Sequence, residues 1–160
     1  MNHSEQLVLM ADRIAAQAES LPRELVTWKP APDAWSMIEI LCHVEEFIPF
    51  WTQQAVNIAR GAGDSWGRDH TDTRRLAAVQ GANERELAEV TANIRSEARA
   101  AAGTLSRLSE ADLAMEATSR NPRWGVKPAR FIVEHLLVQH VEKHIGQIQR
   151  NAAQHPGKPA

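Results

Sequence analysis

The sequence predicts an all-α protein, a four-helix bundle that forms a single domain over residues 1–160. Four long segments carry apolar residues at helical spacing, and we find no alternating strand pattern, internal repeat or coiled-coil heptad. The chain has 160 residues, 43% hydrophobic and 24% charged, which suffices to bury one core. Four long helices in one small domain make a bundle the natural architecture.

Residues 4–21 form the first expected helix. Ser4 can cap its first turn, and Pro22 marks its end because proline disfavours a helical residue before it. The apolar stripe of this helix consists of Leu7, Met10, Ala11, Ile14, Ala18 and Leu21. The segment "TWKPAPDAW" that follows is expected to be an extended connection.

The second helix is expected to begin after Ser36, because Ser36 and Glu39 have the spacing of a capping box. Pro49 lies near its middle, where the ring removes a backbone hydrogen bond and can kink the helix. Gly61 and Gly63 are expected to end it. Its inner stripe consists of Ile40, Val44, Phe47, Trp51, Ala55 and Ile58.

The polar segment "GAGDSWGRDHTDTRR" separates the second helix from the third. Helical spacing resumes around residues 76–79 and is strong over residues 83–108, and whether Gly81 interrupts it stays open. A second irregular segment, "SRNPRWGVK", leads to the last helix, which is expected over residues 129–151. Residues 151–160 are expected to be a loose C-terminal tail.

Three histidines form a candidate metal site. His140 and His144 lie four residues apart on the last helix, so their rings project side by side and can converge on one ion. Such a pair alone is more often structural or exposed. His43 falls on the buried stripe of the second helix, where a third ligand has to come from. Buried imidazoles need an ion or a hydrogen-bond network, and three of them around a divalent cation with an open position form a known catalytic arrangement.

The depths of these histidines predict how the helices are ordered. His43 lies about seven residues, or roughly 10 Å, from the start of its helix, and His144 lies about as far from the end of the last helix. The rings share one level only if these two helices are antiparallel. A metal site therefore predicts an up-down-down-up topology with a long crossover between helices two and three, for which residues 61–80 are long enough.

This layout resembles the DinB/YfiT-like superfamily, through "KPAPDAWSMIEILCHVEEF" early in the chain and "EHLLVQHVEKHIGQI" late. The resemblance spans nearly the whole chain with short motifs. It implies a four-helix bundle of the same order, often a dimer, whose divalent metal is held by His43, His140 and His144. Many relatives carry a further histidine where this chain has Lys143, a difference expected to leave the ligand pair intact and alter the rim of the pocket.

The resemblance also implies an enzyme, because characterised members include thiol-dependent isomerases and thiol S-transferases that use glutathione, bacillithiol or mycothiol. A thiol S-transferase that activates the thiol on its metal is the first hypothesis. A hydrolase using metal-bound hydroxide and a non-catalytic metal-binding stress-response protein are the alternatives. Three protein ligands rather than four favour an open catalytic position. Zinc and nickel are the first candidate metals, and iron, cobalt and copper also accept imidazole.

Several other residues are candidates for the site. Glu46 follows His43 by three residues and is a tentative catalytic group, as a ligand orienter or a proton acceptor, although a solvated glutamate is the commoner outcome. His70 can reach over a pocket mouth or remain a loop histidine, and His135 is expected to point away from the histidine pair. Cys42 is expected to be a buried, inert thiol. The tryptophans that either pack the irregular segments or line a pocket over the metal are Trp28, Trp35, Trp66 and Trp124.

Composition and charge narrow the choice of partners. The chain has 18 Lys and Arg against 20 Asp and Glu, a formal net charge of −2, and its arginines are scattered among glutamates as on a solvated face. This argues against nucleic acid. No stretch approaches the ~20 apolar residues of a membrane span, and the first residues lack a secretory apolar run. The single cysteine permits no internal disulfide. We therefore expect a cytoplasmic protein that acts on a small molecule, with a homodimer implied by the resemblance.

Overall fold

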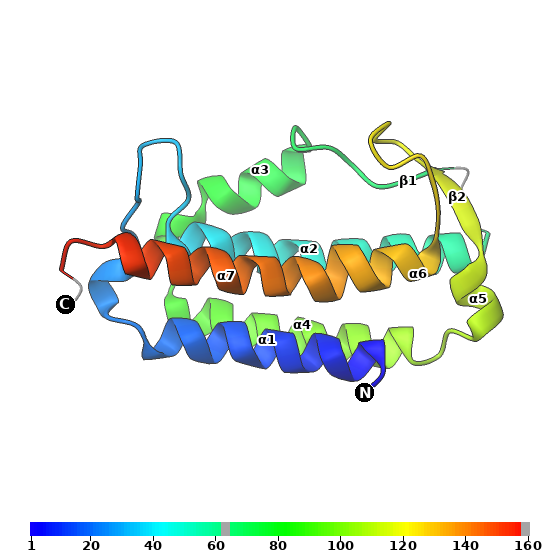
Figure 1. The fold of residues 1–160 in the computed structure, drawn as a ribbon, viewed down its shortest axis with the longest axis horizontal. Helices are drawn as coiled ribbons and strands as arrows, with labels where there is room; N and C mark the ends of the chain where they lie inside the picture. Colours follow the sequence, from blue (N-terminus) through cyan, green and yellow to red (C-terminus); the bar gives the residue numbers. More distant parts are fainter. Residues whose placement is uncertain (62–64, 158–160) are drawn as a thin grey trace.

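The computed structural model describes residues 1–61 and 65–157. Within these residues four long helices lie along one another, namely α1 (His3–Ser20), α2 (Met37–Ala59), α4 (Leu87–Leu105) and α7 (Gln139–Gln154) (Figure 1). The shorter helical elements are η1 (Arg23–Leu25), α3 (Thr73–Gln80), η2 (Ala82–Glu84), α5 (Glu110–Ala114), α6 (Ala129–Phe131) and η3 (Ile132–Val138). The prediction of a mostly helical bundle is confirmed.

The apolar stripes of the four long helices meet in one core, in which α1 contacts α4 and α7, and α2 contacts α4 and α7. In Figure 1, α2 and α4 run from left to right, whereas α1 and α7 run from right to left. α2 and α7 therefore lie side by side in opposite directions. α3 packs on α2. No helix in the described part of the chain combines the length and the apolar character needed to cross a membrane.

Capping boxes begin two of the long helices. At α2 the box is the predicted one, because Ser36 N–H donates to Glu39 at 2.9 Å and Glu39 N–H donates to the Ser36 hydroxyl at 3.3 Å. At α1 the prediction of Ser4 as the cap is wrong. Asn2 caps this helix, since its side chain accepts from Glu5 N–H at 2.9 Å while Asn2 N–H donates to Glu5 at 3.0 Å.

The third long helix is shorter than its apolar spacing predicts. Gly81 interrupts the helical pattern: its N–H bonds back to Ala77 at the end of α3, and η2 follows before α4 begins at Leu87. α4 ends at Leu105, so Leu108 lies beyond it. Leu108, beyond the end of α4, still packs against the core and so extends the apolar spacing, whereas α3, before Gly81, has no buried residue.

A small three-stranded sheet corrects the expectation that the chain has no strands. β1 (Ser65–Trp66) pairs in parallel with β2 (Glu116–Ser119), which pairs antiparallel with β3 (Val126–Pro128). Strands of this length show no readable alternation, and two of them fall in the segments read as irregular. Trp66 of β1 is buried: its ring donates from Nε1 to the Ala117 carbonyl of β2 at 2.8 Å and meets Trp51 of α2 at 6.3 Å between ring centroids.

One continuous helix was expected over residues 129–151, but the structure divides this stretch into three elements. The chain passes from α6 through η3, a π-helical stretch in which Gln139 N–H donates to the Glu134 carbonyl five residues back, into α7. α7 continues to Gln154, so the loose tail expected from residue 151 begins later. The predicted helix end at Gly63, and residues 158–160 of the tail, lie outside the described residues.

Candidate metal centre

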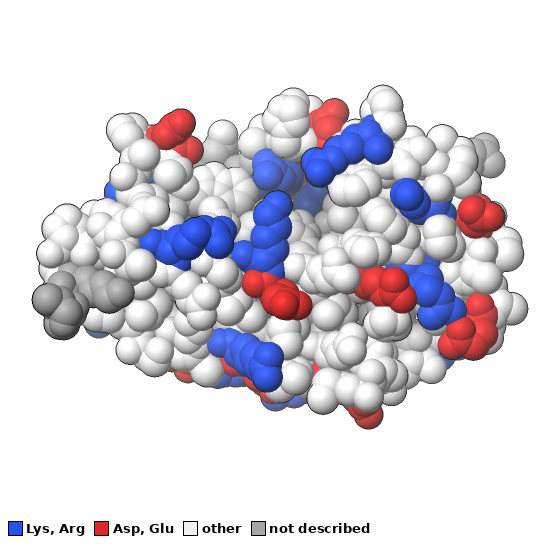
Figure 2. Space-filling view, in the orientation of Figure 1, with Lys and Arg blue, Asp and Glu red and all other residues white. Residues whose placement is uncertain are grey.

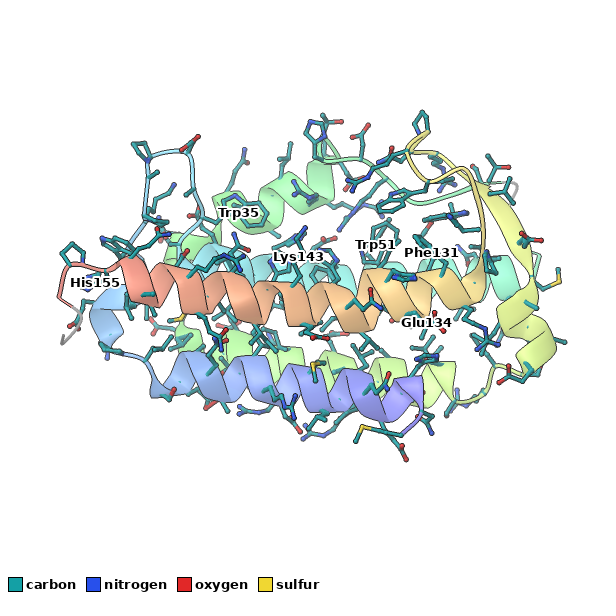
Figure 3. All side chains as sticks on the ribbon, viewed as in Figure 1. Trp35, Trp51, Phe131, Glu134, Lys143 and His155 are labelled. Atoms are coloured by element: carbon teal, nitrogen blue, oxygen red, sulfur yellow. The ribbon has the colours of Figure 1, made fainter. Side chains whose placement is uncertain are left out.

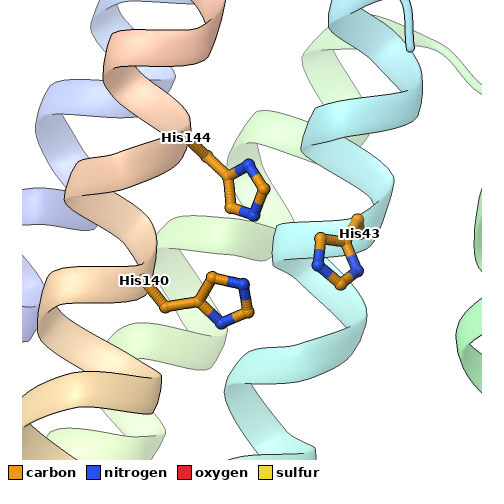
Figure 4. A group of neighbouring side chains, drawn as sticks. All are labelled: His43, His140 and His144. Carbon is orange, nitrogen blue, oxygen red and sulfur yellow. The ribbon is translucent and has the colours of Figure 1, made fainter. Parts of the chain in front are cut away.

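The structure brings the three predicted ligands together. His43 comes from α2, and His140 and His144 come from consecutive turns of α7; their rings point toward one another (Figure 4). One ligand atom of each ring lies within 4.8 Å of the others. His43 and His144 are only 3% and 7% exposed, and His140 is half-buried. Three imidazoles thus converge from two antiparallel helices on one point in the bundle.

Hydrogen bonds orient the two rings of α7. His140 Nδ1 lies 3.2 Å from the Leu136 carbonyl, and His144 Nδ1 lies 2.7 Å from Gln147 Oε1. A neutral imidazole that donates from Nδ1 carries its lone pair on Nε2, the atom left to bind an ion. Such bonds to the remote nitrogen are the usual second contact of metal-binding histidines.

Two buried ring nitrogens of the cluster find no hydrogen-bond partner among the described residues. They are His43 Nδ1 and His144 Nε2. Burying a polar atom without a partner costs free energy that a metal ion would offset. The donor set of three imidazoles suits a divalent transition metal, so these residues fit the predicted ion.

The electrostatics keep all three rings neutral. Burial is the main cause that lowers their pKa values, to about 2 for His43, about 3 for His140 and about 4 for His144. The charge of Arg75 lowers each pKa further. At neutral pH the rings are therefore in the unprotonated form that binds metals.

Aromatic side chains hold the rings in place. Phe47, one turn after His43, stacks on His140 with ring centroids 4.0 Å apart and planes 4° apart. Trp35 meets His43 edge to face at 5.0 Å. The cluster therefore has an apolar surround as well as convergent nitrogens.

A cavity of about 570 Å³ opens over His43 and His140, and we call it the site cavity. Trp51, Trp124 and Phe131 form its apolar walls. Its charged and polar lining includes Arg68, Asp69, His70, Arg75, Arg123 and Lys143. Its volume is in the range of small-molecule sites.

Glu46 does not join the histidine cluster. Its carboxylate pairs with Arg68, whose Nη1 donates to Glu46 Oε2 at 2.8 Å, and Arg68 lines the site cavity. Cys42, the neighbour of His43, is fully buried, and its pKa is raised to about 11, chiefly by burial. Its thiol is therefore protonated at neutral pH, as expected of an inert cysteine.

His70 and His135 both line the site cavity. His135 is exposed, as expected, and its ring contacts Phe131 and Gln139, yet it lines the same cavity as His140. Residues five apart on an α-helix differ by about 140° in direction. The π-helical stretch η3 closes its turns over five residues, which places His135 and His140 on the same cavity.

The four tryptophans divide between the two expected roles. Trp124 lines the site cavity and packs on Phe131, whereas Trp66 is buried beneath the sheet. Trp35 contacts His43, and Trp28 packs on the ring of His155 away from the cavity.

The cations of the cavity were missed, because scattered arginines read as a solvated face. Arg68 and Arg75 come from the segment between α2 and the end of α3, and Arg123 comes from the β2–β3 hairpin. A signal was present, since arginines stand beside tryptophans in both irregular segments, as in "SWGR" and "PRWG". Their convergence depends on how these segments fold over the bundle.

Comparisons with known proteins agree with this architecture. A family model described as "DinB superfamily" matches residues 6–148 of the chain. A solved structure of YfiT from Bacillus subtilis, described as a "probable metal-dependent hydrolase with an unusual four-helix bundle topology", has a TM-score of 0.74 at 10% identity, covering 94% of this chain and 86% of that one. A mycothiol-dependent maleylpyruvate isomerase has a TM-score of 0.70 at 10% identity, covering 92% of this chain.

The chain spans 61% of the length of that isomerase. No curated protein matches the sequence. At 10% identity the two solved structures establish the shared fold alone. The family match extends over most of the chain and includes all three histidines of the cluster. The chain belongs to the DinB superfamily.

Proposed function

We propose that this protein is a metal-dependent enzyme in which His43, His140 and His144 hold a divalent transition metal, with zinc or nickel first. The two buried ring nitrogens without a partner are the observation that carries this proposal. A metal bound there would lower the pKa of a thiol or a water molecule and so supply a nucleophile near neutral pH.

A thiol S-transferase is the first proposed activity, with a low-molecular-weight thiol such as glutathione, bacillithiol or mycothiol as co-substrate. The fold shared with a mycothiol-dependent isomerase supports this choice. Metal-dependent hydrolysis is the second candidate, supported by the fold shared with YfiT. In both cases the site cavity would hold the substrate against His43 and His140, between the aromatic walls.

Glu46 is proposed to act as a positioning residue. Its carboxylate holds Arg68, which packs with its guanidinium 3.9 Å from the ring centroid of Phe50 and lines the site cavity. The role of proton acceptor is less well supported, because the contacts given for this carboxylate are to Arg68.

We further infer the up-down-down-up order of the bundle, with the segment between α2 and α4 as the crossover. The helix directions in Figure 1 and the level at which the three histidines meet support this order. A homodimer, implied by the family resemblance, and a cytoplasmic location, expected from the sequence composition, stay proposals.

Metal analysis tests the site. The wild type, His43→Ala and His140→Ala would be loaded with zinc or nickel, dialysed and analysed by mass spectrometry of the metal. Loss of stoichiometric metal in both variants is expected, whereas His135→Ala, which removes another cavity histidine, should retain it. Undiminished metal in His43→Ala and His140→Ala would overturn the assignment.

A thiol screen then separates the two activities. The metal-loaded protein would be given glutathione, bacillithiol or mycothiol with the electrophile monochlorobimane, and conjugate formation followed by fluorescence. Conjugation that requires both the metal and one of the thiols supports the transferase. Failure with every thiol, combined with hydrolysis of ester or amide substrates, would replace it by the hydrolase.

A further inference from the structure

Three cations from three different elements face the site cavity. Arg75 comes from α3, Arg123 from the β2–β3 hairpin and Lys143 from α7. Figure 2 shows Lys and Arg side chains gathered around a hollow above the middle of α7, and Figure 3 labels Lys143, Trp51 and Phe131 along it. Among the described residues none of these three cations forms an ion pair with a carboxylate.

The remaining charged groups at the cavity are one arginine and three carboxylates. Arg68 is paired with Glu46 and with Asp72, whose Oδ1 lies 3.2 Å from Arg68 Nη1. Asp69 is exposed at the rim, where it accepts the backbone N–H of Thr71 at 2.8 Å. With Arg75, Arg123 and Lys143 added, the cations still outnumber these carboxylates, although the whole chain has a formal net charge of −2.

Arg75 is the best placed of the three. Its side chain is half-buried, its Nη1 donates to the His70 carbonyl at 3.2 Å, and its guanidinium lies 5.3 Å from the ring centroid of Trp35. Trp35 in turn contacts His43. Burial, then the charge of Arg68, lowers the pKa of Arg75 despite the opposing charges of Glu46 and Asp72, so this cation is held in a partly desolvated place near another cation. An anion would offset that cost.

Part of the cavity lining is apolar. Trp124 packs on Phe131 at 5.4 Å between ring centroids, and Trp51 and Leu136 extend this wall. Arg123 lies over the ring of Trp124 at 4.6 Å. A ligand that contacts both the cations and the apolar residues of the cavity therefore has a negative group and an apolar or aromatic portion.

We infer that the site cavity binds a small organic anion, with a carboxylate or phosphate group held by Arg75, Arg123 and Lys143 and an apolar portion against Trp124 and Phe131. A guanidinium binds either group through two parallel hydrogen bonds, which gives a defined orientation. The inference rests on the proposed function in that it names the substrate class of the same centre, next to His43 and His140.

Binding of three model ligands tests the inference. Phenylacetate, phenyl phosphate and the neutral phenylacetamide would be titrated calorimetrically into the zinc-loaded full-length protein at low ionic strength. At least one of the two anions is expected to bind about tenfold or more tightly than the amide. The stronger anion then identifies the group, carboxylate or phosphate. Equal binding of all three ligands would overturn the inference.

Variants locate the anion. Arg75→Gln should weaken binding of the preferred anion about tenfold and leave the amide unchanged. Arg99→Gln is the matched control, because Arg99 is 60% exposed on α4 and does not line the cavity. If Arg75→Gln does not fold, the double variant Arg123→Gln/Lys143→Gln replaces it, since both residues are exposed. Undiminished anion binding in these variants would contradict the assignment.

The metal-free variant His43→Ala separates this inference from the proposed function. Retained preference for the anion over the amide in that variant supports the cation site even if the metal-dependent activity fails. Loss of anion binding in His43→Ala, together with no effect of Arg75→Gln, would mean that the metal holds the anion and would overturn the inference. Metal content of Arg75→Gln equal to that of wild type shows that the metal centre itself is intact.

Discussion

Two consecutive glutamates of α2 have contrasting surroundings. Glu45 meets Arg85, whose two terminal nitrogens donate to its oxygens at 2.9 and 2.8 Å, and Asn93 of α4, which donates at 3.0 Å. Glu46 meets Arg68, which lines the site cavity. The first glutamate ties helices together, whereas the second borders a cavity.

The polar groups beyond these two glutamates differ in the same way. On the side of Glu45 the charges are matched within the fold. On the side of Glu46, Arg75 has no carboxylate partner among the described residues, and His43 and His144 each keep a buried nitrogen without a hydrogen bond. Matched polar groups stabilise a fold, and unmatched ones mark where a ligand is needed.

Acid is expected to have the largest effect on stability, because it charges the buried histidines of the metal centre. In the metal-free protein the pKa values of His43, His140 and His144 are about 2, 3 and 4, below the ordinary 6.5. As the pH falls below 6.5 the unfolded chain takes up protons that the folded chain does not, so stability is complete above pH 6.5 and decreases toward pH 4. Urea unfolding across this range should show a loss of several kcal/mol.

The control for this pH dependence is His43→Phe, which removes one titrating ring and should flatten the dependence between pH 6.5 and 4. An unchanged free energy of unfolding across that range in the wild type would mean that the three rings are not held neutral by burial.

Removal of one ligand is the next largest effect. His144→Ala is expected to lower zinc affinity by more than about 100-fold, because loss of a partner outside the ligand set alone costs 10–100-fold. Competition with a chromophoric chelator measures it. His135→Ala should bind zinc like the wild type, and equal affinity in His144→Ala would place the ion elsewhere.

Gln147 is expected to orient the ring of His144. Gln147→Ala removes the partner of His144 Nδ1 and should weaken zinc binding about tenfold, without abolishing it. The same chelator competition applies. Gln149→Ala on the exposed side of α7 is the matched control, and equal losses in both variants would argue against an orienting role.

The two glutamates themselves give the smallest effects, and these should have different readouts. Glu45→Gln is expected to lower the free energy of unfolding by about 1 kcal/mol, measured in urea, with anion binding unchanged. Glu46→Gln should raise the affinity for phenylacetate or phenyl phosphate a few-fold, because Arg68 loses its main counter-charge. Identical behaviour of the two variants would remove the distinction between the two sides of α2.

The parts of the fold in which residues recur at helical spacing could be predicted from the sequence. The four apolar stripes, the capping box at Ser36 and the His140–His144 pair each have a fixed spacing on a helix. His43 could be joined to the pair because its depth in α2 is set by the same geometry. These features follow from the spacing of residues along a helix, which can be read directly from one sequence.

The remaining features depend on contacts between distant segments. Ser65 of β1 pairs with Thr118 of β2, although the two residues are far apart in the sequence. Arg75 and Arg123 line the same cavity but come from two distant segments of the chain. The spacing of residues in the sequence does not predict such contacts between distant segments. The π-helical stretch η3 also escaped prediction, because residues 132–138 have the apolar character of an ordinary buried helix.

The π-helical stretch η3 lies between the β2–β3 hairpin and the histidine pair and so affects how these two parts of the cavity lining are turned relative to each other. The histidine pair lies after it, and the hairpin with Arg123 and Trp124 lies directly before the same continuous helix, so the wider turns of η3 affect how the hairpin is turned relative to the pair. One residue more or fewer in this stretch would swing the hairpin by about 100° around the helix axis. Substitutions in the hairpin would therefore change which ligand is selected, whereas a change of length between Phe131 and His140 would displace the hairpin from the histidine pair.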